Sequence, residues 1–473
     1  MGEAQAACQG RPASEALAAV IAALSAQFGN RLVTSQAVRE QHGHTLTWVP
    51  NQPPDAVVFP QSTEEVASIV RLCAAHVVPV IPFGTGTSLE GHVNAPFGGI
   101  CVDTSLMKAV VEVHPEDLSV TVEPGLTRKA LNEYLRDMGL FFPIDPGADA
   151  SIGGMVSTRA SGTNAVRYGT MKDNVLSLSV VTPQGEVIKT ARRAKKSSTG
   201  YDLTRLYTGA EGTLGIITGI TLKLSGIPEA VSAGICPFPS VRAACDAVIM
   251  TIQSGLPVAR IELLDALTVR ACNNHAKLGL PETPLLLVEF HGTDAGVKEQ
   301  AERFGEIAAE FAGGPFEWAT KLEDRTKLWQ ARHDVYWAQL TLRPGSTPIS
   351  TDVCVPISRL ADCVEETARD AEEHHILAPI VGHVGDGNFH CGVLLDMNDP
   401  DEVAAAREFC ERMVLRALDM DGTCSGEHGV GQGKMKYLLQ EHGAATLHIM
   451  AQIKKALDPL NIMNPGKVVA WET

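Results

Sequence analysis

The sequence lacks the features that mark several classes of protein. No apolar run reaches the roughly 18–20 residues that a membrane-spanning helix needs, and the N-terminus does not show the basic and then apolar order of a signal peptide. Although the 473 residues include 11 cysteines, no two of them are spaced as Cys-x-x-Cys. Iron–sulfur and structural zinc sites of that spacing are therefore excluded, and the cysteines are expected to be reduced and mostly buried.

Basic residues are also few. Lysine and arginine together number 39 against 55 aspartates and glutamates, which gives a net charge of −16. A general nucleic-acid-binding protein needs a basic surface, so no nucleic-acid partner is expected. The composition, 45% hydrophobic and 20% charged, is that of an ordinary globular protein.

Strand and helix patterns divide the chain near residue 227. Residues 56–83 read strand, helix, strand, which predicts a parallel pair joined by a crossover. From residue 350 the order is strand, helix, strand, strand, helix, as in a ferredoxin-like unit. The class is therefore α+β. The predicted parts are an N-terminal helical segment (1–50), a first domain (51–227), a second domain (228–458) and a C-terminal segment (459–473).

A glycine-rich loop, Gly84–Ser88 (GTGTS), follows the first predicted crossover. Glycines let backbone N–H groups approach an anion, and the hydroxyl groups add donors, so a diphosphate would fit. The spacing differs from the Gly-x-Gly-x-x-Gly of dinucleotide-binding folds. Residues 429–434 do not form a Walker loop either, because Met435 stands where Ser or Thr is needed. On its own, Gly84–Ser88 fits a tight turn as well as a phosphate site.

Further segments of this kind follow in order along the chain. Residues 143–169 are dense in small residues, as expected of a backbone that lies against a flat ligand. The ordered motifs are Pro82–Ser88 (PFGTGTS), Val122–Gly125 (VEPG), Asp145–Gly154 (DPGADASIGG), Ser161–Gly169 (SGTNAVRYG) and Glu211–Gly215 (EGTLG). This set resembles the FAD-binding domain of the vanillyl-alcohol-oxidase type, in the branch of D-lactate dehydrogenase (cytochrome) and glycolate oxidase. The resemblance implies a two-part FAD-binding domain of PCMH type, followed by a ferredoxin-like C-terminal domain of FAD-linked oxidases.

The resemblance also implies which residues contact FAD. The loop at Gly84–Ser88 would cradle the diphosphate, and residues 150–169 would surround the flavin and its ribityl chain. Relatives that bind flavin covalently in this loop carry a histidine where Thr87 stands, so non-covalent FAD is expected. The implied cofactor residues are Pro82, Gly84, Thr85, Gly86, Thr87, Ser88, Pro146, Gly147, Ser151, Gly153, Gly154, Ser157, Ser161, Gly162, Asn164, Tyr168, Gly169, Gly212, Ile217 and Asn464.

Residues 382–391 (GHVGDGNFHC) predict a hairpin that carries two histidines. Residues 385–388 form a strong turn sequence between apolar runs. With these four residues as the loop, His383 pairs with His390 across the strands, about 5 Å apart at the β-carbons. Two imidazoles at such a distance suit a divalent metal. The alternative is that both histidines are ordinary core or surface residues.

A third ligand is expected in Ser425–Gly431 (SGEHGVG). Glu427 and His428 are adjacent, so one side chain can bind a metal while the other faces a reacting group. Two histidines and a carboxylate fit Zn²⁺, Mn²⁺ or Fe²⁺, and zinc is taken as the expected ion. Both stretches resemble metal-dependent D-2-hydroxyacid dehydrogenases, which implies His383, His390 and Glu427 as metal ligands and His428 as the catalytic base.

A cation for a substrate carboxylate is expected in Leu328–Trp337 (LWQARHDVYW). Arg332 can grip a carboxylate with two hydrogen bonds, although an arginine on such a helix is usually part of a surface ion pair. The segment resembles the substrate region of cytochrome-linked D-lactate dehydrogenases, which implies that Arg332 is a catalytic and substrate-binding residue. Tyr336, one turn further, is expected on the same helix face.

The resemblance also bears on the size of the substrate. Relatives that act on 2-hydroxyglutarate carry a lysine where Ser350 stands and an asparagine where Gly392 stands. Both differences remove polar groups that a second carboxylate could use. They favour a substrate with a short or apolar side chain.

The function expected from these observations is oxidation of a D-2-hydroxy acid, with D-lactate to pyruvate as the first choice. A metal lowers the pKa of the substrate hydroxyl, an imidazole accepts its proton near neutral pH, and the hydride passes to FAD. The electrons would pass to cytochrome c, a quinone or an electron-transfer flavoprotein. The alternatives are the same chemistry on D-2-hydroxyglutarate or glycolate, and a metal hydrolase without a redox role. A cytoplasmic location is expected, while a homodimer and peripheral contact with a membrane stay open.

Overall fold

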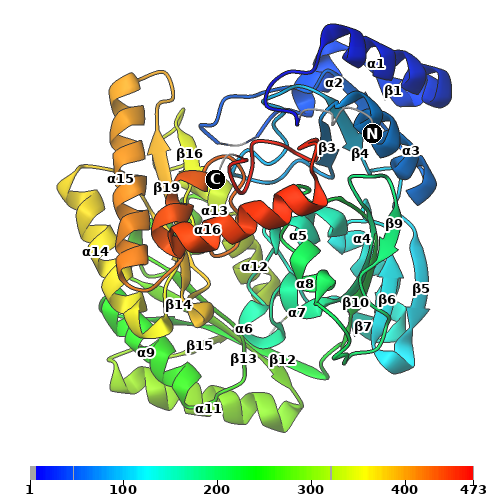
Figure 1. The fold of residues 1–473 in the computed structure, drawn as a ribbon. Coiled ribbons are helices and arrows are strands. Elements are labelled where there is room, and N and C mark those ends of the chain that lie inside the picture. Colours follow the sequence, from blue (N-terminus) through cyan, green and yellow to red (C-terminus); the bar gives the residue numbers. More distant parts are fainter. Residues whose placement is uncertain (1–6, 46, 320–321, 472–473) are drawn as a thin grey trace. The chain divides into compact units, whose positions relative to one another are not determined.

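The computed structural model describes residues 7–45, 47–319 and 322–471, and the chain forms two compact units. Unit 1 contains residues 1–161, 170–227 and 427–473, and unit 2 contains residues 162–169 and 228–426. The chain thus returns to unit 1 at Glu427, earlier than residue 459, where the sequence placed the C-terminal segment. In the colours of Figure 1, unit 2 is mainly green to orange.

Unit 1 begins with a small mixed sheet and the helices that pack on it. The strands are β1 (Leu32–Val33), β2 (Ala56–Val58), β3 (Val80–Phe83) and β4 (Ile100–Asp103), and the helices are α1 (Ser14–Phe28), α2 (Gln36–Gln41) and α3 (Thr63–His76). The strand order is β1-β2-β4-β3. Both β2 and β3 are parallel to β4, which lies between them. The predicted crossover β2-α3-β3 is therefore present, but its two strands are not neighbours.

A second, antiparallel sheet of unit 1 has the order β5-β6-β10-β8-β9. Its strands are β5 (Val110–His114), β6 (Ser119–Val122), β8 (Val175–Val181), β9 (Val187–Lys189) and β10 (Ile216–Lys223), and a short pair is formed by β7 (Leu140–Phe141) and β11 (Ser225–Gly226). The remaining helices of unit 1 are α4 (Arg128–Leu135), α5 (Ile152–Thr158), α7 (Met171–Asn174), α8 (Leu203–Tyr207) and α16 (Leu438–Leu457). Helix α16 is interrupted at Gly443, which has a φ of 76°.

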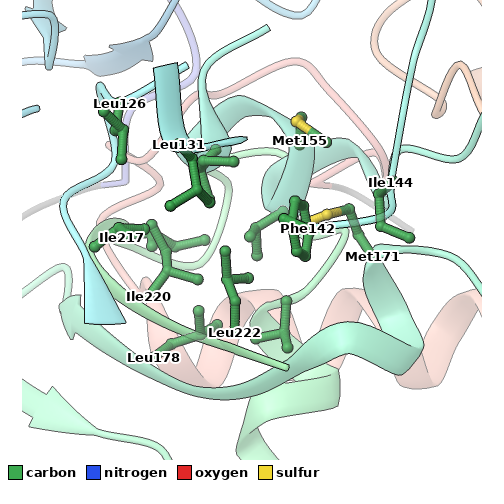
Figure 2. Close-up of a cluster of buried hydrophobic side chains, with 14 of the residues drawn as sticks. Leu126, Leu131, Phe142, Ile144, Met155, Met171, Leu178, Ile217, Ile220 and Leu222 are labelled. Carbon is green, nitrogen blue, oxygen red and sulfur yellow. The ribbon is translucent and has the colours of Figure 1, made fainter. Parts of the chain in front are cut away.

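The core of this part is formed by side chains from both the helices and the sheet. Figure 2 shows Leu131 of α4 and Met155 of α5 facing Ile220 and Leu222 of β10, with Phe142 among them. All five are at most 1% exposed. Each such side chain contributes roughly 1.5–3 kcal/mol on burial. The core therefore fixes β10 and α5, the elements that carry several of the implied FAD residues.

Unit 2 is built on one antiparallel sheet with the order β15-β12-β14-β13-β18-β19-β16, and β17 also pairs with β19. The strands are β12 (Ala230–Pro237), β13 (Val258–Leu264), β14 (Leu285–Gly292), β15 (Glu317–Ala319), β16 (Thr347–Ser350), β17 (Val353–Cys354), β18 (Ile380–Gly382) and β19 (Asn388–Leu395). The helices are α6 (Ala165–Tyr168), α9 (Val241–Gln253), α10 (Ala266–Ala276), α11 (Asp294–Glu310), α12 (Leu322–His333), α13 (Val335–Gln339), α14 (Leu360–Glu373) and α15 (Pro400–Asp419). The predicted order of strand, helix, strand, strand, helix from residue 350 is confirmed as β16/β17-α14-β18-β19-α15.

The structure bears on two expectations from the sequence, those on the cysteines and on membrane-spanning helices. In the part of the chain that the structure describes, no disulfide is formed, and the cysteines are buried except for Cys354, which is half-buried. This confirms the expectation of mostly buried thiols. Among the described helices, none is both long and apolar enough to cross a membrane.

Candidate active site

The three predicted metal ligands lie together. One ligand atom from each of His383, His390 and Glu427 lies within 4.8 Å of the others. His383 follows β18, His390 is in β19, and Glu427 comes directly after Gly426 at the end of unit 2. Both histidines are buried, at 8% and 7% exposure. The arrangement can hold one divalent ion.

The hairpin that carries the histidines differs from the predicted one. His390 pairs with Val381, not with His383. The reason is the turn, in which Val384–Asp386 form a 3₁₀ helix closed by a hydrogen bond from Asp386 N–H to the His383 carbonyl at 3.1 Å. The loop therefore includes His383 itself, and the register shifts by two residues. The two imidazole rings still meet edge to face, with their centroids 5.5 Å apart.

Each histidine is oriented by a hydrogen bond at Nδ1. The Nδ1 atom of His383 lies 2.7 Å from Oε1 of Glu262, and that of His390 lies 2.9 Å from the carbonyl oxygen of Thr351. A ring that donates from Nδ1 presents the lone pair of Nε2, the form in which histidine ligates a metal. These residues therefore fit a divalent ion such as zinc, with Nε2 of each ring as the ligand atom.

Glu262 is a site residue that the sequence analysis missed. It lies in β13, is 1% exposed, and contacts His383 through one carboxylate oxygen and Arg332 through the other. Burial by itself raises the pKa of Glu262, but His383 and Arg332 outweigh this effect and hold the pKa below its usual value. A signal was present in the sequence, since Arg260 and Glu262 are two charged residues within an otherwise apolar strand.

Arg332, the predicted substrate cation, lies in the last turn of α12 and is part of this network. Its Nε donates to Oε2 of Glu262 at 2.8 Å, and its Nη2 lies 2.7 Å from the same oxygen. The expectation that Tyr336 shares a helix face with Arg332 is wrong, because α12 ends at His333 and Tyr336 belongs to α13. Tyr336 instead packs edge to face on Trp337, with centroids 5.0 Å apart.

A second buried carboxylate, Asp352, holds the segments on either side of the metal ligands. Its Oδ1 accepts a hydrogen bond from Asn388 Nδ2 at 2.7 Å, and its Oδ2 accepts one from Ser425 Oγ at 2.9 Å. Asn388 begins β19, and Ser425 lies two residues before Glu427. Asp352 thereby fixes the backbone on which His390 and Glu427 stand.

Substitution of Gly387 by alanine is expected to disturb the predicted metal site. Gly387 has a φ of 80°, and a β-carbon there would overlap the carbonyl oxygen of Val355. A side chain in this conformation costs about 1–3 kcal/mol, and the turn between His383 and His390 must shift. We expect G387A to have a lower Tm and a weaker affinity for Zn²⁺, as measured by thermal unfolding and by competition with a chelator.

The matched control for G387A is G305A. Gly305 lies in α11, and a β-carbon there would have no atom within 4 Å. Alanine in a helix interior is favoured over glycine by about 0.8–1 kcal/mol, so G305A should keep or raise the Tm and leave Zn²⁺ binding unchanged. Equal Zn²⁺ affinities in G387A and G305A would contradict the account of the turn.

The predicted base, His428, stands on a loop of unit 1 that a buried glutamate holds in place. Glu211 accepts hydrogen bonds from the N–H groups of Val430 at 2.7 Å and Gly431 at 2.8 Å. Its Oε2 also lies 3.2 Å from Nε2 of His92. A β-carbon on Gly429 would lie 2.6 Å from Glu211 and 2.7 Å from His92, so the loop can approach this pair only with glycine at position 429.

The electrostatics of Glu211 follow from these contacts. Burial raises the pKa of Glu211, but His92 and the two backbone N–H donors more than compensate, so the pKa lies below its usual value. Asn464, an implied FAD residue, joins the same group, because its Nδ2 donates to the carbonyl oxygens of His92 and Glu211 at 3.1 and 2.7 Å. The resemblance implies only a cofactor role for the EGTLG motif, and the part of Glu211 in holding the His428 loop was missed.

The glycine-rich loop after β3 is in contact with two other motif segments of unit 1. A β-carbon on Gly84 would overlap Oγ of Ser151, the N-cap of α5. A β-carbon on Gly212 would lie 2.6 Å from the ring of Pro82. Glycine at these two positions therefore lets residues 82–88 lie against Ser151 as well as against Gly212.

The same loop offers polar groups to a ligand. In the described ranges, the N–H groups of Thr85, Gly86, Thr87 and Ser88 donate to no backbone carbonyl. Within the loop, Oγ of Ser88 is one of the buried side-chain atoms of the described residues that have no hydrogen-bond partner. A buried polar atom without a partner is costly, so this loop fits an anionic and polar group such as the FAD diphosphate.

Four of the implied FAD residues, Gly162, Asn164, Tyr168 and Gly169, belong to unit 2. There Asn164 Oδ1 accepts a hydrogen bond from Nε of Arg260 at 2.8 Å, and the Tyr168 hydroxyl lies 2.7 Å from Nδ1 of His291. The segment 162–169 is thus held on the sheet of unit 2 by both side chains.

The remaining implied FAD residues lie in or next to the elements of unit 1 described above. Ser157 Oγ donates to the Gly153 carbonyl at 2.8 Å inside α5. Ile217 lies in β10, and Ser161 is buried. A β-carbon on Gly147 would have no atom within 4 Å, so the surroundings of Pro146-Gly147 are open. The FAD contacts of all these residues stay predictions.

Comparison with known proteins identifies the family. Residues 227–468 match the model of the C-terminal domain of FAD-linked oxidases, and residues 54–191 match that of an FAD-binding domain. The chain is 52% identical to "Probable D-lactate dehydrogenase, mitochondrial" of Danio rerio over 92% of this chain and 88% of that protein. It is 50% identical to "D-lactate dehydrogenase [cytochrome], mitochondrial" of Arabidopsis thaliana over 88% of this chain and 73% of that protein.

A solved structure gives the same fold. The 4-ethylphenol oxidase of Gulosibacter chungangensis aligns with a TM-score of 0.81 over 99% of both chains, at 19% identity. The predicted fold class, an FAD-binding domain of PCMH type followed by an FAD-oxidase C-terminal domain, is confirmed. The chain belongs to the family of FAD-linked oxidases.

Proposed function

We propose that this protein is an FAD- and metal-dependent D-lactate dehydrogenase, which oxidises D-lactate to pyruvate. The observation that carries the proposal is the identity of 52% and 50%, over most of the chain, to two proteins named as D-lactate dehydrogenases. The grouping of His383, His390 and Glu427 supports the metal dependence. We take zinc as the metal ion. We take FAD as non-covalently bound, since relatives with covalently bound flavin carry a histidine where this chain has Thr87.

The chemistry of the reaction assigns a role to each residue. When bound, FAD accepts a hydride and the metal ion polarises the substrate hydroxyl. His428 takes the proton of that hydroxyl, which an imidazole can do near neutral pH. Arg332 holds the substrate carboxylate with its donors other than those used by Glu262, and Tyr336 is proposed as a further substrate contact.

The proposed substrate is short because of two neighbouring positions in the sheet. Ser350 of β16 and Gly392 of β19 face each other across the strands. A β-carbon on Gly392 would overlap the amide of Gln339, a buried residue of α13. The side chain of Gln339 therefore occupies the space beside Gly392, and neither strand position carries a cation for a second carboxylate. This supports D-lactate or D-2-hydroxybutyrate over D-2-hydroxyglutarate.

The electron acceptor and the location belong to the same proposal. The name of the Arabidopsis relative includes a cytochrome, so cytochrome c is the proposed acceptor, with a quinone or an electron-transfer flavoprotein as alternatives. Both relatives carry "mitochondrial" in their names, whereas the sequence of this chain predicted a cytoplasmic location. The location of this chain stays a prediction, as do a homodimer and peripheral membrane contact.

The proposal is tested by a visible absorption spectrum followed by a substrate panel. We expect the purified protein to be yellow, and to lose the colour into the supernatant on acid precipitation. With a dye as acceptor, kcat/KM should be highest for D-lactate or D-2-hydroxybutyrate, and lower for glycolate and D-2-hydroxyglutarate. A colourless protein would favour a metal hydrolase, and a preference for glycolate or D-2-hydroxyglutarate would replace the proposed substrate.

A further inference from the structure

The two central strands of unit 2 have one face that carries charged groups. Arg260 lies directly opposite Glu289 in the pairing of β13 with β14. Since side chains alternate between the faces of a sheet, Glu262 and His291, each two residues further along, lie on the same face. The other face is apolar, as Phe290 packs on Phe304 of α11 with ring centroids 6.1 Å apart. Charged residues thus alternate with apolar ones inside a buried sheet.

Burial of these charged groups lowers the stability of the folded protein, so their presence calls for an explanation other than stability. Glu262 and Glu289 are 1% and 4% exposed, and burial of a carboxylate costs several kcal/mol before its partners compensate. A buried ion pair commonly contributes nothing to stability compared with apolar residues of the same shape. A requirement for these groups in binding or catalysis is therefore a better explanation than stability.

Of the two carboxylates, only Glu262 touches predicted active-site residues. Its Oε1 lies 2.7 Å from His383 Nδ1, and its Oε2 lies 2.7 Å from Arg332 Nη2. We propose that Glu262 is the positioning residue that sets both the metal-ligating orientation of His383 and the orientation of the Arg332 guanidinium. The part that concerns Arg332 rests on the proposed function, while the part that concerns His383 does not.

The physical reason is that each oxygen of Glu262 fixes one partner. Acceptance of a hydrogen bond from Nδ1 of His383 keeps the proton on that nitrogen and leaves Nε2 for a metal ion. Acceptance from Nε and Nη2 of Arg332 holds the guanidinium plane and leaves its remaining donors for a carboxylate. Loss of the negative charge disturbs both partners at once, because a carboxamide cannot accept two hydrogen bonds at one end and one at the other.

The first test is the affinity of E262Q for Zn²⁺. We measure Zn²⁺ binding of the FAD-loaded protein by competition with a chelator, and expect E262Q to bind about 10- to 100-fold more weakly than wild type. The matched control is E289Q, which removes a buried carboxylate from the same sheet face, where Glu289 contacts His291 at 2.8 Å and Arg260 at 3.6 Å. E289Q should lower the Tm as E262Q does, but keep the affinity for Zn²⁺.

Two outcomes overturn the His383 part: an unchanged Zn²⁺ affinity in E262Q, or an equal loss in E262Q and E289Q, which would indicate a general effect on folding. This measurement does not depend on turnover. If the wild-type protein oxidised no 2-hydroxy acid, the proposed function would fail while the Zn²⁺ measurement still decided the role of Glu262.

The Arg332 part is tested by a double-mutant cycle on KM for D-lactate. Residues that act as a unit give non-additive effects. We expect E262Q and R332Q each to raise KM, and the double variant to raise it by much less than the product of the two single effects. Multiplicative effects would show that Glu262 and Arg332 act separately, and would overturn this part of the proposal.

Discussion

Replacement of His428 by alanine is expected to abolish turnover and to leave FAD bound. Removal of a general base lowers kcat by roughly 10²–10⁴-fold. The loss should appear in kcat for D-lactate, measured with a dye acceptor on protein whose FAD content is determined by absorption. No other described residue is proposed to accept the hydroxyl proton, so added substrate should not restore the rate.

The loop should survive the substitution, because it has anchors other than the His428 side chain. Glu211 binds the backbone N–H groups of Val430 and Gly431, and Gly429 packs against Glu211 and His92. None of these contacts uses the imidazole of residue 428. We therefore expect H428A to keep a Tm close to that of wild type, which separates loss of chemistry from loss of folding.

The control for H428A is H448A. His448 is an exposed residue of α16 in the same unit, so its substitution removes an imidazole without touching the loop. H448A should keep the kcat and the FAD content of wild type. Normal turnover in H428A would contradict the assignment of His428 as the base. Loss of FAD from H428A would indicate that His428 binds the cofactor instead.

The sequence allowed the family, the fold class and the grouping of His383, His390 and Glu427 to be predicted, because each depends on short motifs. GHVGDGNFH contains both histidines within eight residues, so any tight turn brings them together. The register of the hairpin was predicted wrongly for a local reason. Whether the loop has four residues or includes His383 depends on a 3₁₀ turn whose alternatives the sequence does not separate.

The carboxylates that support the site could not be predicted in the same way. Glu262 is separated from His383 by 121 residues and from Arg332 by 70. Glu211 is 219 residues away from the Val430 N–H that it binds. Such pairs are formed by the packing of distant elements, which no local pattern specifies. Two charged residues within an otherwise apolar strand, as Arg260 and Glu262 are in VARIELL, are nonetheless a signal that could be used.

The end of the helix between Arg332 and Tyr336 was missed for a different reason from the buried carboxylates. The helical spacing of four residues predicts one shared face, but the helix ends at His333, and Asp334 precedes the start of α13. Helix propensity alone gives no strong stop there, because neither glycine nor proline occurs between Leu328 and Trp337. Tertiary packing of α12 and α13 therefore decides the break.

Replacement of His390, one of the three predicted metal ligands, by alanine is expected to lower kcat about as strongly as the replacement of His428 does. In H390A the Nε2 ligand is removed, while the partners of His383 and the Asp352 contacts to Asn388 and Ser425 remain. Because substitutions of residues that only orient a ligand already cost about 10- to 100-fold in metal affinity or activity, we expect a larger loss for the ligand itself. Zn²⁺ content by elemental analysis and kcat for D-lactate should fall together, and FAD content should not.

Chelation gives the same result by an independent route. Wild-type protein treated with a chelator should lose activity to the level of H390A, and Zn²⁺ or Mn²⁺ added back should restore wild type but not H390A. The matched control is H275A, since His275 is an exposed residue of α10 in the same unit as His390. H275A should respond to the chelator and to added metal as wild type does. Full activity of the chelated wild-type protein, with no metal detected, would remove the ion from the proposed reaction and leave His383 and His390 as two buried imidazoles in edge-to-face contact.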